Sequence, residues 1–139
     1  MADLGTKEYK VQLLTPDKEF FVGEAVFTSI PAVDGELGVL ANHAPMVARL
    51  SPGAMRMHSK DGKRFYFITG GFAEMNANVL TVLATGVDCI EGCTVPEADS
   101  QYHDACCLPD TTPKEAELKK YSIAKARAMQ IIARDLAGL

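Results

Sequence analysis

About the first 90 residues consist of short alternating apolar and polar segments, separated by turn residues roughly every 8–12 positions. The alternation at Val11, Leu13 and Thr15 returns over residues 26–30 and ends at Pro31, which lacks the N–H that a sheet ladder needs. Evenly spaced short strands of this kind are typical of a sandwich. We therefore expect an α+β protein that begins with an antiparallel β-sandwich of about ten strands.

The clearest local turn signal is Asp61-Gly62, which lies between two β-type segments, residues 55–58 and 64–68. It predicts a hairpin with a type I′ turn, in which both central residues have positive φ. Further along, Gly70-Gly71 ends the second of these strands, and residues 76–78 turn the chain into Val79–Ala84.

Residues 34–46 read DGELGVLANHAPM, with two glycines, a carboxylate, an Asn-His pair and a proline between short apolar runs. This composition predicts a tight, polar-tipped loop between strands. For a carboxylate in such a turn, the simplest interpretation of Glu36 is a solvated side chain.

The chain changes character after Gly92, where three prolines punctuate a polar stretch, and we expect a β-sandwich domain at 1–92 and a helical domain at 93–139. Thr112 is suited to cap a helix, with Pro113 at its first position and Glu115 at the capping-box offset. The predicted helix has about 24 residues, or roughly 36 Å at 1.5 Å per residue. At most two or three turns fit between Pro96 and Pro109. The predicted apolar face of the last helix comprises Leu118, Tyr121, Ala124, Ala128, Ile131, Ile132, Leu136 and Leu139.

Charge is unevenly distributed over the 139 residues, whose net charge is −4. Residues 1–113 hold 8 Lys/Arg against 15 Asp/Glu, and residues 114–139 hold 6 against 3. Because the first part has no basic stripe with aromatic residues, nucleic acid is not an expected partner. No run of 18 apolar residues exists, and the N-terminal stretch, which has no apolar region and carries acids, predicts neither a secretory signal nor a transit peptide.

The sequence contains no recognisable catalytic motif. It has no Gly-x-Ser-x-Gly elbow and no Gly-x-x-x-x-Gly-Lys loop, and Gly70-Gly71 lacks the third glycine of a dinucleotide fingerprint. Nothing activates Ser29 beside Glu36 and His43, so these residues do not predict a catalytic triad. We expect a non-enzymatic protein without a cofactor.

Four cysteines at 89, 93, 106 and 107, with His103 among them, fall within nineteen residues. Their types would suit a zinc site using Cys89, Cys93, His103 and Cys106, but the spacing matches no familiar zinc module. Reduced thiols are the preferred interpretation, and a small β-sandwich holding a metal or acting in redox chemistry is the alternative function.

Four stretches together resemble the epsilon subunit of F-type ATP synthases, which is called delta in mitochondria. They are LTPD at 14–17, the GELG…HAP segment within 34–46, LSPGAMRM at 50–57, and GGFAEMNANVLTVLA at 70–84, which occur in the order and spacing of that family. The four stretches lie between residues 14 and 84. It implies a rotor subunit of the central stalk that joins gamma to the c ring, peripheral to an energy-transducing membrane.

The resemblance also implies roles for particular residues. Glu36 and His43 match positions that meet the polar loops of the c ring, although His43 could instead fix its own loop through backbone hydrogen bonds. A patch against gamma should be apolar. Its candidates are Phe20, Phe21, Phe72 and Met75, with a core position as the alternative for each.

In that family the C-terminal helical hairpin can extend along gamma towards the alpha and beta subunits and inhibit ATP hydrolysis. The basic residues Lys125, Arg127 and Arg134 would suit the acidic surfaces met there. This chain departs from the family before its last helix, where no I/L-D-x-x-R-A motif for ATP occurs. ATP binding is therefore not expected.

Overall fold

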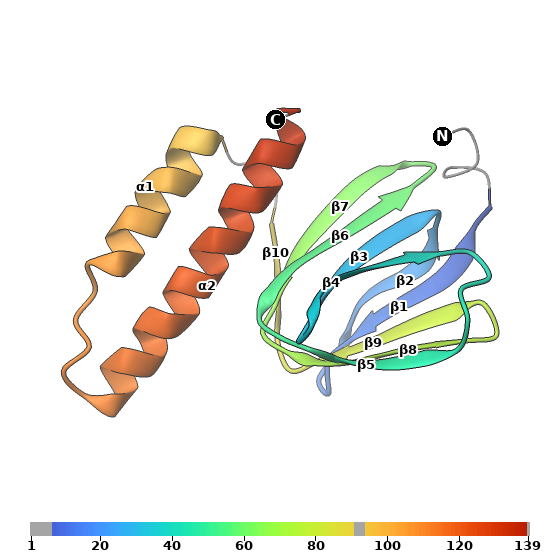
Figure 1. Ribbon diagram of the computed structural model, residues 1–139, viewed down its shortest axis with the longest axis horizontal. Coiled ribbons are helices and arrows are strands. Elements are labelled where there is room, and N and C mark those ends of the chain that lie inside the picture. Colours follow the sequence, from blue (N-terminus) through green and yellow to red (C-terminus); the bar gives the residue numbers. More distant parts are fainter. Residues whose placement is uncertain (1–6, 91–93, 139) are drawn as a thin grey trace. The chain divides into compact units, whose positions relative to one another are not determined.

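The computed structural model describes residues 7–90 and 94–138. The chain divides into two compact units, Met1–Cys89 and Ile90–Leu139. The first unit is built of strands and the second of helices (Figure 1). The strands are β1 (Tyr9–Leu14), β2 (Glu19–Ala25), β3 (Phe27–Ala32), β4 (Gly35–Leu40), β5 (Met46–Leu50), β6 (Gly53–Ser59), β7 (Gly62–Ile68), β8 (Gly71–Asn76), β9 (Val79–Ala84) and β10 (Val87–Cys89).

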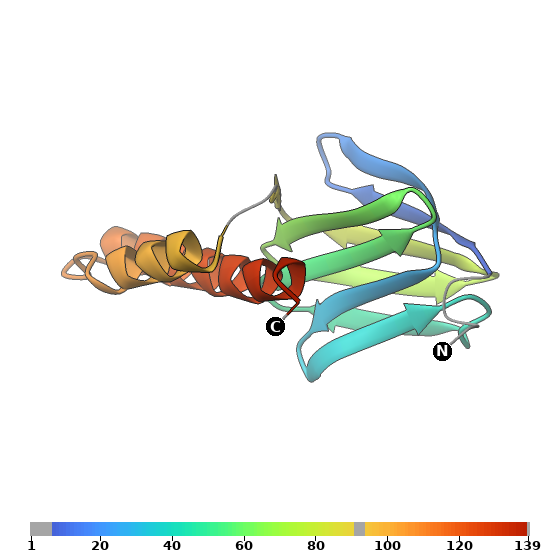
Figure 2. The same cartoon turned by 90° about the horizontal axis from the view of Figure 1, so that it is seen from above.

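The strands form two layers, β10-β7-β6-β3 with β4 beside β3, and β5-β8-β9-β1-β2 (Figures 1 and 2). The layers join at a corner where Ala32 of β3 pairs with Leu50 of β5. The predicted sandwich of about ten strands is thus confirmed. One pair differs from the antiparallel prediction, because β1 runs parallel to β9. Local turns fix only antiparallel hairpins, whereas this pair joins segments far apart in the chain.

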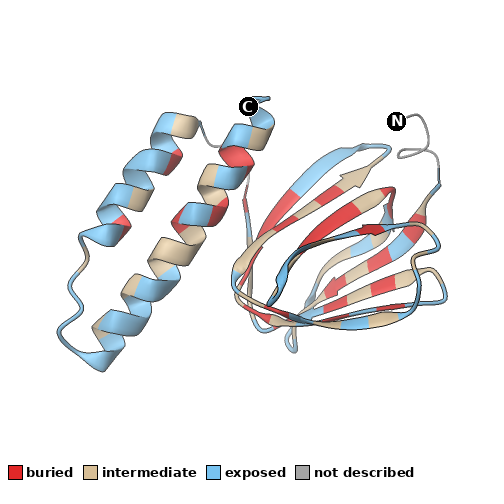
Figure 3. Ribbon diagram, viewed as in Figure 1, coloured by how far each residue is buried: buried red, intermediate tan, exposed pale blue. Residues whose placement is uncertain are grey.

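The core fills the space between the layers, as the distribution of buried residues shows (Figure 3). Tyr9, Val11 and Leu13 of β1 point inward, and Thr28 and Ile30 of β3 face them from the other layer. This alternation follows the predicted one, since successive side chains of a strand point to opposite faces. The core also contains methionines from both layers, at positions 55, 57 and 75.

The hairpin predicted at Asp61-Gly62 exists, but its turn lies one residue earlier. Ser59 pairs with Gly62, so Lys60 and Asp61 form the turn, and only Gly62 has a positive φ, of 138°. The type I′ prediction is wrong here, because Gly62 is already the first residue of β7. The turn at Ala77-Asn78 instead has positive φ at both positions, 50° and 63°.

The segment 34–46 is not a single loop. Its middle forms β4, which pairs along its length with β3. Two connections therefore flank a strand: a tight turn before Gly35 and a longer loop, residues 41–45, that contains His43. The apolar residues between Glu36 and His43 form the strand, which the polar composition of the whole segment did not reveal. Val39 in this strand is completely buried.

The second unit is a hairpin of α1 (Val95–Cys106) and α2 (Pro113–Leu136). Thr112 and Glu115 form the predicted capping box, and the 24-residue length is confirmed. Thr94 and Glu97 cap α1 in the same way, a capping box that was not predicted. α1 contains Pro96 in its first turn, and its 12 residues make about 3.3 turns, slightly more than the two or three expected, because proline is tolerated at the start of a helix.

The predicted apolar face of α2 is only partly buried. Ala128 and Ile132 are buried as expected, whereas Leu118, Ile131 and Leu136 are 60%, 51% and 47% exposed. The remaining buried positions of α2 are small residues, Ala126 and Ala133. Apolar residues at helical spacing show which face of α2 can be buried. How much of that face is buried depends on the length of the helix packed against it, and α1 is half as long as α2. Leu139 lies outside the described residues.

Candidate functional site

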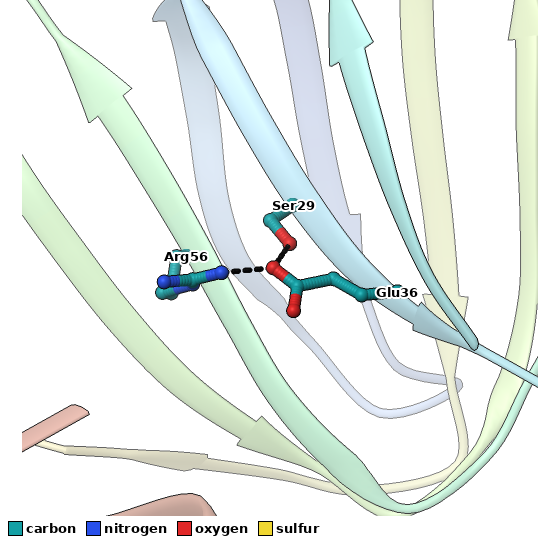
Figure 4. A network of polar contacts seen from close by, with 3 residues as sticks. All are labelled: Ser29, Glu36 and Arg56. Carbon is teal, nitrogen blue, oxygen red and sulfur yellow. Dashed lines mark hydrogen bonds and ion pairs between the residues drawn. The ribbon is translucent and has the colours of Figure 1, made fainter. Parts of the chain in front are cut away.

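Glu36 lies in a polar cluster on the outer face of one layer, formed by neighbouring strands (Figure 4). Ser29 of β3 and Arg56 of β6 are directly paired, and Glu36 of β4 pairs with Pro31, two residues along from Ser29. The Ser29 hydroxyl and the Arg56 guanidinium both donate a hydrogen bond to Glu36 Oε1. Glu36 is therefore anchored, contrary to the simple solvated interpretation.

The electrostatics of this cluster keep Glu36 ionised. The hydrogen bond from Ser29 lowers the pKa of Glu36 most, and Arg56 lowers it further through its hydrogen bond and its charge, while partial burial acts in the opposite direction. Ser29 itself is 1% exposed, whereas the Glu36 side chain is 54% exposed. The exposed Glu36 carboxylate thus accepts a hydrogen bond from the buried Ser29 hydroxyl. Sequence patterns did not single out Arg56, whose position opposite Ser29 follows once the strand register is known.

His43 lies at the other end of β4 from Glu36, in the β4–β5 loop. Its Nδ1 is 2.8 Å from the carbonyl oxygen of Ala44, so this nitrogen carries the proton and donates to the backbone. The preceding residue, Asn42, has a φ of 63°, and its N–H donates to Oδ1 of Asn78 at 2.7 Å. The structure thus shows the backbone contact that was the alternative role for His43. It does not bring His43 and Glu36 together on one loop.

A groove of about 430 Å³ opens beside Glu36, between the β3–β4 turn and β5. Val33 and Val47, 53% and 72% exposed, line it together with the charged groups Asp34, Glu36 and Arg49. It therefore combines apolar walls with a polar rim.

The outer face of the other layer carries adjacent exposed apolar residues. Phe72 of β8 pairs with Leu83 of β9, which pairs with Leu14 of β1. Phe72 and Leu83 are 57% and 53% exposed, and Leu14 is half-buried. Arg49 lies opposite Phe72 at one end of this row, and Glu19 lies opposite Leu14 at the other. We call Leu14, Phe72 and Leu83 the apolar row.

The other candidates for the gamma patch have different surroundings. Met75 is completely buried, so it belongs to the core and not to a surface patch. Phe20 and Phe21 are partly buried against the core. Their rings are also covered by cations, with Lys18 Nζ 4.4 Å from the centroid of Phe20 and the Arg64 guanidinium 5.1 Å from that of Phe21. Leu83 and Leu14 were missed, because only the register places them beside Phe72.

The basic residues of α2 differ in their contacts. Arg127 donates a hydrogen bond to the Tyr102 hydroxyl at 3.3 Å and lies 5.7 Å from its ring centroid. Lys125 is half-buried and lines a groove of about 350 Å³ between the two helices. Arg134 is exposed in the last turn of α2. Two of the three side chains are therefore directed towards α1 in this hairpin.

The cysteines show no metal site within the described parts of the chain. Cys89, Cys106 and Cys107 are exposed free thiols, and Cys93 lies outside the described residues. His103 Nε2 is 3.9 Å from Sγ of Cys107, the C-cap residue of α1. Over residues 7–90 and 94–138, no three His, Cys, Asp or Glu side chains are grouped so that they could hold a metal ion.

Neither described helix is long and apolar enough to cross a membrane. Together, the fold and its surfaces define a β-sandwich protein with a C-terminal helical hairpin. The β-sandwich domain of the ATP synthase delta/epsilon chain matches residues 8–88, and the chain belongs to that family. The resemblance inferred from the four sequence stretches is confirmed.

Two curated relatives match the chain over longer stretches than the β-sandwich domain does. The ATP synthase epsilon chain of Rhodopirellula baltica is 36% identical over 118 residues, which cover 83% of this chain and 90% of the relative. The chloroplastic epsilon chain of Tetradesmus obliquus is 36% identical over 96 residues, which cover 69% and 71%.

Two solved structures share the fold. A chain in the cryo-EM structure of the Euglena gracilis mitochondrial ATP synthase, OSCP/F1/c-ring, has a TM-score of 0.72 at 20% identity, covering 92% of this chain and 82% of that one. A chain in the central stalk/c-ring structure from Tetrahymena thermophila has a TM-score of 0.57 at 15% identity, covering 93% and 98%.

Proposed function

We propose that this chain is the epsilon-type subunit of the central stalk in a proton-translocating ATP synthase, a non-catalytic rotor component that joins gamma to the c ring. Family membership supports this assignment, and the relatives with 36% identity are themselves named epsilon chains. It would be attached to an energy-transducing membrane only through the complex, on the side where the catalytic head lies.

The observation that carries the proposal is the apolar row on the outer face of β1, β8 and β9. Adjacent exposed aromatic and aliphatic side chains are uncommon on a monomer surface unless a partner covers them. The row ends in Arg49 and Glu19, an arrangement with an apolar centre and a charged rim. We assign this surface to gamma, with Phe72 as its central residue.

The test is binding of the full chain to a catalytic head that contains gamma, with Phe72→Ser as the variant. Removing a central aromatic contact costs about 1–3 kcal/mol in such interfaces, or roughly 5- to 150-fold in Kd. Because Phe72 is exposed, the variant should keep the stability of the wild-type chain. Leu40→Ser, at an exposed position on β4 in the other layer, is the matched control. Unchanged binding by Phe72→Ser would assign gamma to another face.

We further propose that Glu36 provides a contact to the c ring, and that the helical hairpin regulates ATP hydrolysis. The exposure of Glu36 supports the first role. The exposed apolar residues of α2, Leu118, Ile131 and Leu136, support the second, because they offer a surface that another chain could cover. The backbone hydrogen bond of His43 favours a structural role for this residue in its own loop.

A further inference from the structure

The hydrogen bonds around Glu36 determine how its carboxylate is oriented towards a partner. We propose that Ser29 and Arg56 are positioning residues, which bind Glu36 Oε1 so that Oε2 faces a loop of the c ring that donates hydrogen bonds. This inference rests on the proposed function. It adds Ser29 and Arg56 to the proposed contact and specifies that the partner donates hydrogen bonds.

The sheet register fixes the geometry of the cluster. Directly opposite residues of antiparallel strands have Cβ atoms about 4.5–5.5 Å apart, and diagonal neighbours about 7–8 Å. Ser29 and Arg56 are directly opposite, and Glu36 is diagonal to Ser29. A long Glu side chain spans that diagonal. Because all three residues lie on paired strands, the carboxylate has a fixed direction, whereas a residue on a loop would not.

The two carboxylate oxygens have different surroundings. Among the described residues, both hydrogen bonds to Glu36 end on Oε1, and Oε2 points away from Ser29 and Arg56 (Figure 4). An ionised carboxylate only accepts hydrogen bonds. The partner must therefore supply a donor to Oε2, which means an amide, a backbone N–H or a cationic side chain.

The groove beside Glu36 indicates what else the partner loop presents. Val33 and Val47 form exposed apolar walls, and the groove volume of about 430 Å³ admits a few side chains. A short polar loop with one small apolar side chain next to its donor fits this combination. Because Arg56 neutralises Glu36, attraction to such a loop depends on the local hydrogen bond more than on long-range charge.

Other charged groups surround the cluster and define the controls. Asp34 and Arg49 line the groove, and His58 follows Arg56 on the same face of β6, 5.4 Å from the Phe27 ring between centroids. Asp34→Asn and His58→Gln therefore separate the contributions of these two neighbours from that of Glu36 as the pH is lowered.

The experiment measures the Kd of the full chain for a detergent-solubilised c ring carrying gamma, from pH 3 to pH 8. Its variants are Glu36→Gln, Ser29→Ala, Arg56→Gln and Arg56→Lys. We expect Glu36→Gln to weaken binding about tenfold or more, and Ser29→Ala roughly 3- to 10-fold. Arg56→Lys should recover part of the loss that Arg56→Gln causes. Ser59→Ala, which removes a hydroxyl bonded to Gly62 at the far end of β6, is the matched control and should bind normally.

Two features distinguish positioning from a merely structural role. Ser29→Ala should add little loss when Glu36 is already Gln, because the hydroxyl acts through the carboxylate. Since the native cluster lowers the pKa of Glu36, its ionised form is lost only as the pH falls through that lowered value. Removing the hydroxyl raises this pKa, so the pH at which binding fails should move upward in Ser29→Ala.

NMR titration of the Glu36 carboxyl in the isolated chain tests the geometry without any partner. A pKa that is unchanged in Ser29→Ala would overturn the positioning role, as would additive losses in the double variant. If the wild-type chain fails to bind the c ring and gamma, the proposed function is wrong and so is the partner assigned to Oε2. If it binds and Glu36→Gln binds equally well, only the inference about Glu36 is overturned.

Discussion

At the scale of single residues, Tyr9 shows how one polar group is accommodated inside the sandwich. Its hydroxyl oxygen lies 2.6 Å from Thr28 Oγ1 and 2.9 Å from the carbonyl oxygen of Val39. A carbonyl can only accept, so the phenol proton goes to Val39 and the Thr28 hydroxyl can donate to Tyr9. These bonds link β1 to β3 and β4 across the core.

Tyr9→Phe should therefore destabilise the sandwich by about 1–3 kcal/mol, because Thr28 and Val39 each lose a buried partner. Urea denaturation measures the loss. Tyr9→Phe combined with Thr28→Val should cost less than the sum of the single changes, since the two hydroxyls satisfy each other. Strict additivity would contradict the coupling.

The same residue predicts a pH dependence at alkaline pH. Burial raises the pKa of Tyr9 to about 12, while the hydrogen bond to Thr28 opposes this shift. The raised pKa means that the stabilisation is complete below about pH 10, where the unfolded chain still holds this proton. Stability should fall as the pH rises from about 10 to about 12, with a shallower slope in Tyr9→Phe.

Gly71 is a position where two backbones come too close for any side chain. A Cβ there would lie 2.0 Å from the carbonyl oxygen of Leu83, and the residue has a φ of 132°. Gly62 has a similar φ, 138°, but open space around it. Gly62→Ala thus reports backbone strain alone, about 1–3 kcal/mol.

Gly71→Ala should cost about 1–3 kcal/mol more than Gly62→Ala, because it adds the clash with β9. Urea denaturation of the two variants gives this difference directly. Equal losses would mean that β8 and β9 separate at little cost. The difference isolates close packing from strain, which one variant alone could not do.

At the scale of elements, the helix ends are the part of the structure that local sequence specifies best. The Thr112 hydroxyl accepts from the Glu115 N–H at 3.1 Å, and Glu115 Oε1 accepts from the Thr112 N–H at 3.2 Å. Thr112→Ala should destabilise the start of α2 by roughly 1 kcal/mol, whereas Thr112→Ser should be nearly neutral.

Amide hydrogen exchange in the first turn of α2 measures this change locally. Exchange there should accelerate in Thr112→Ala, while exchange in the β-sheet should stay the same, because the two units have separate cores. Thr94→Ala is the matched control, since it removes the equivalent cap of α1. Faster exchange throughout the sheet would show that the two units unfold together.

These elements also show how far the sequence could predict the fold. The cap of α2, the β6–β7 hairpin and the 24-residue helix follow from residues close together in the chain, and these were predicted, whereas the cap of α1 was not. The parallel pairing of β1 with β9 and the exposure of Leu118 depend on distant partners, and local patterns do not contain them. Arg56 became a candidate only when the register placed it opposite Ser29.

At the scale of the whole molecule, the division into two units suggests two separable roles. The strand unit carries the apolar row and the Glu36 cluster, and the helical unit carries its own hydrogen bonds between α1 and α2. Within the hairpin, Gln130 donates to Asp99 at 2.9 Å, and Arg127 donates to Tyr102 at 3.3 Å. Exposed interactions of this kind are individually weak, so we expect the buried residues of α1 and α2 to contribute most to the stability of the hairpin.

We therefore predict that removing residues 93–139 leaves binding to gamma within about twofold, a change of about 0.4 kcal/mol. ATP hydrolysis by the catalytic head should be lower with the full chain than with the truncated one, because we propose that the helical unit regulates hydrolysis. Circular dichroism must first show that residues 1–92 retain their sheet. Equal hydrolysis with both chains would make the hairpin structural, and loss of binding by the truncated chain would place part of the gamma contact on the helices.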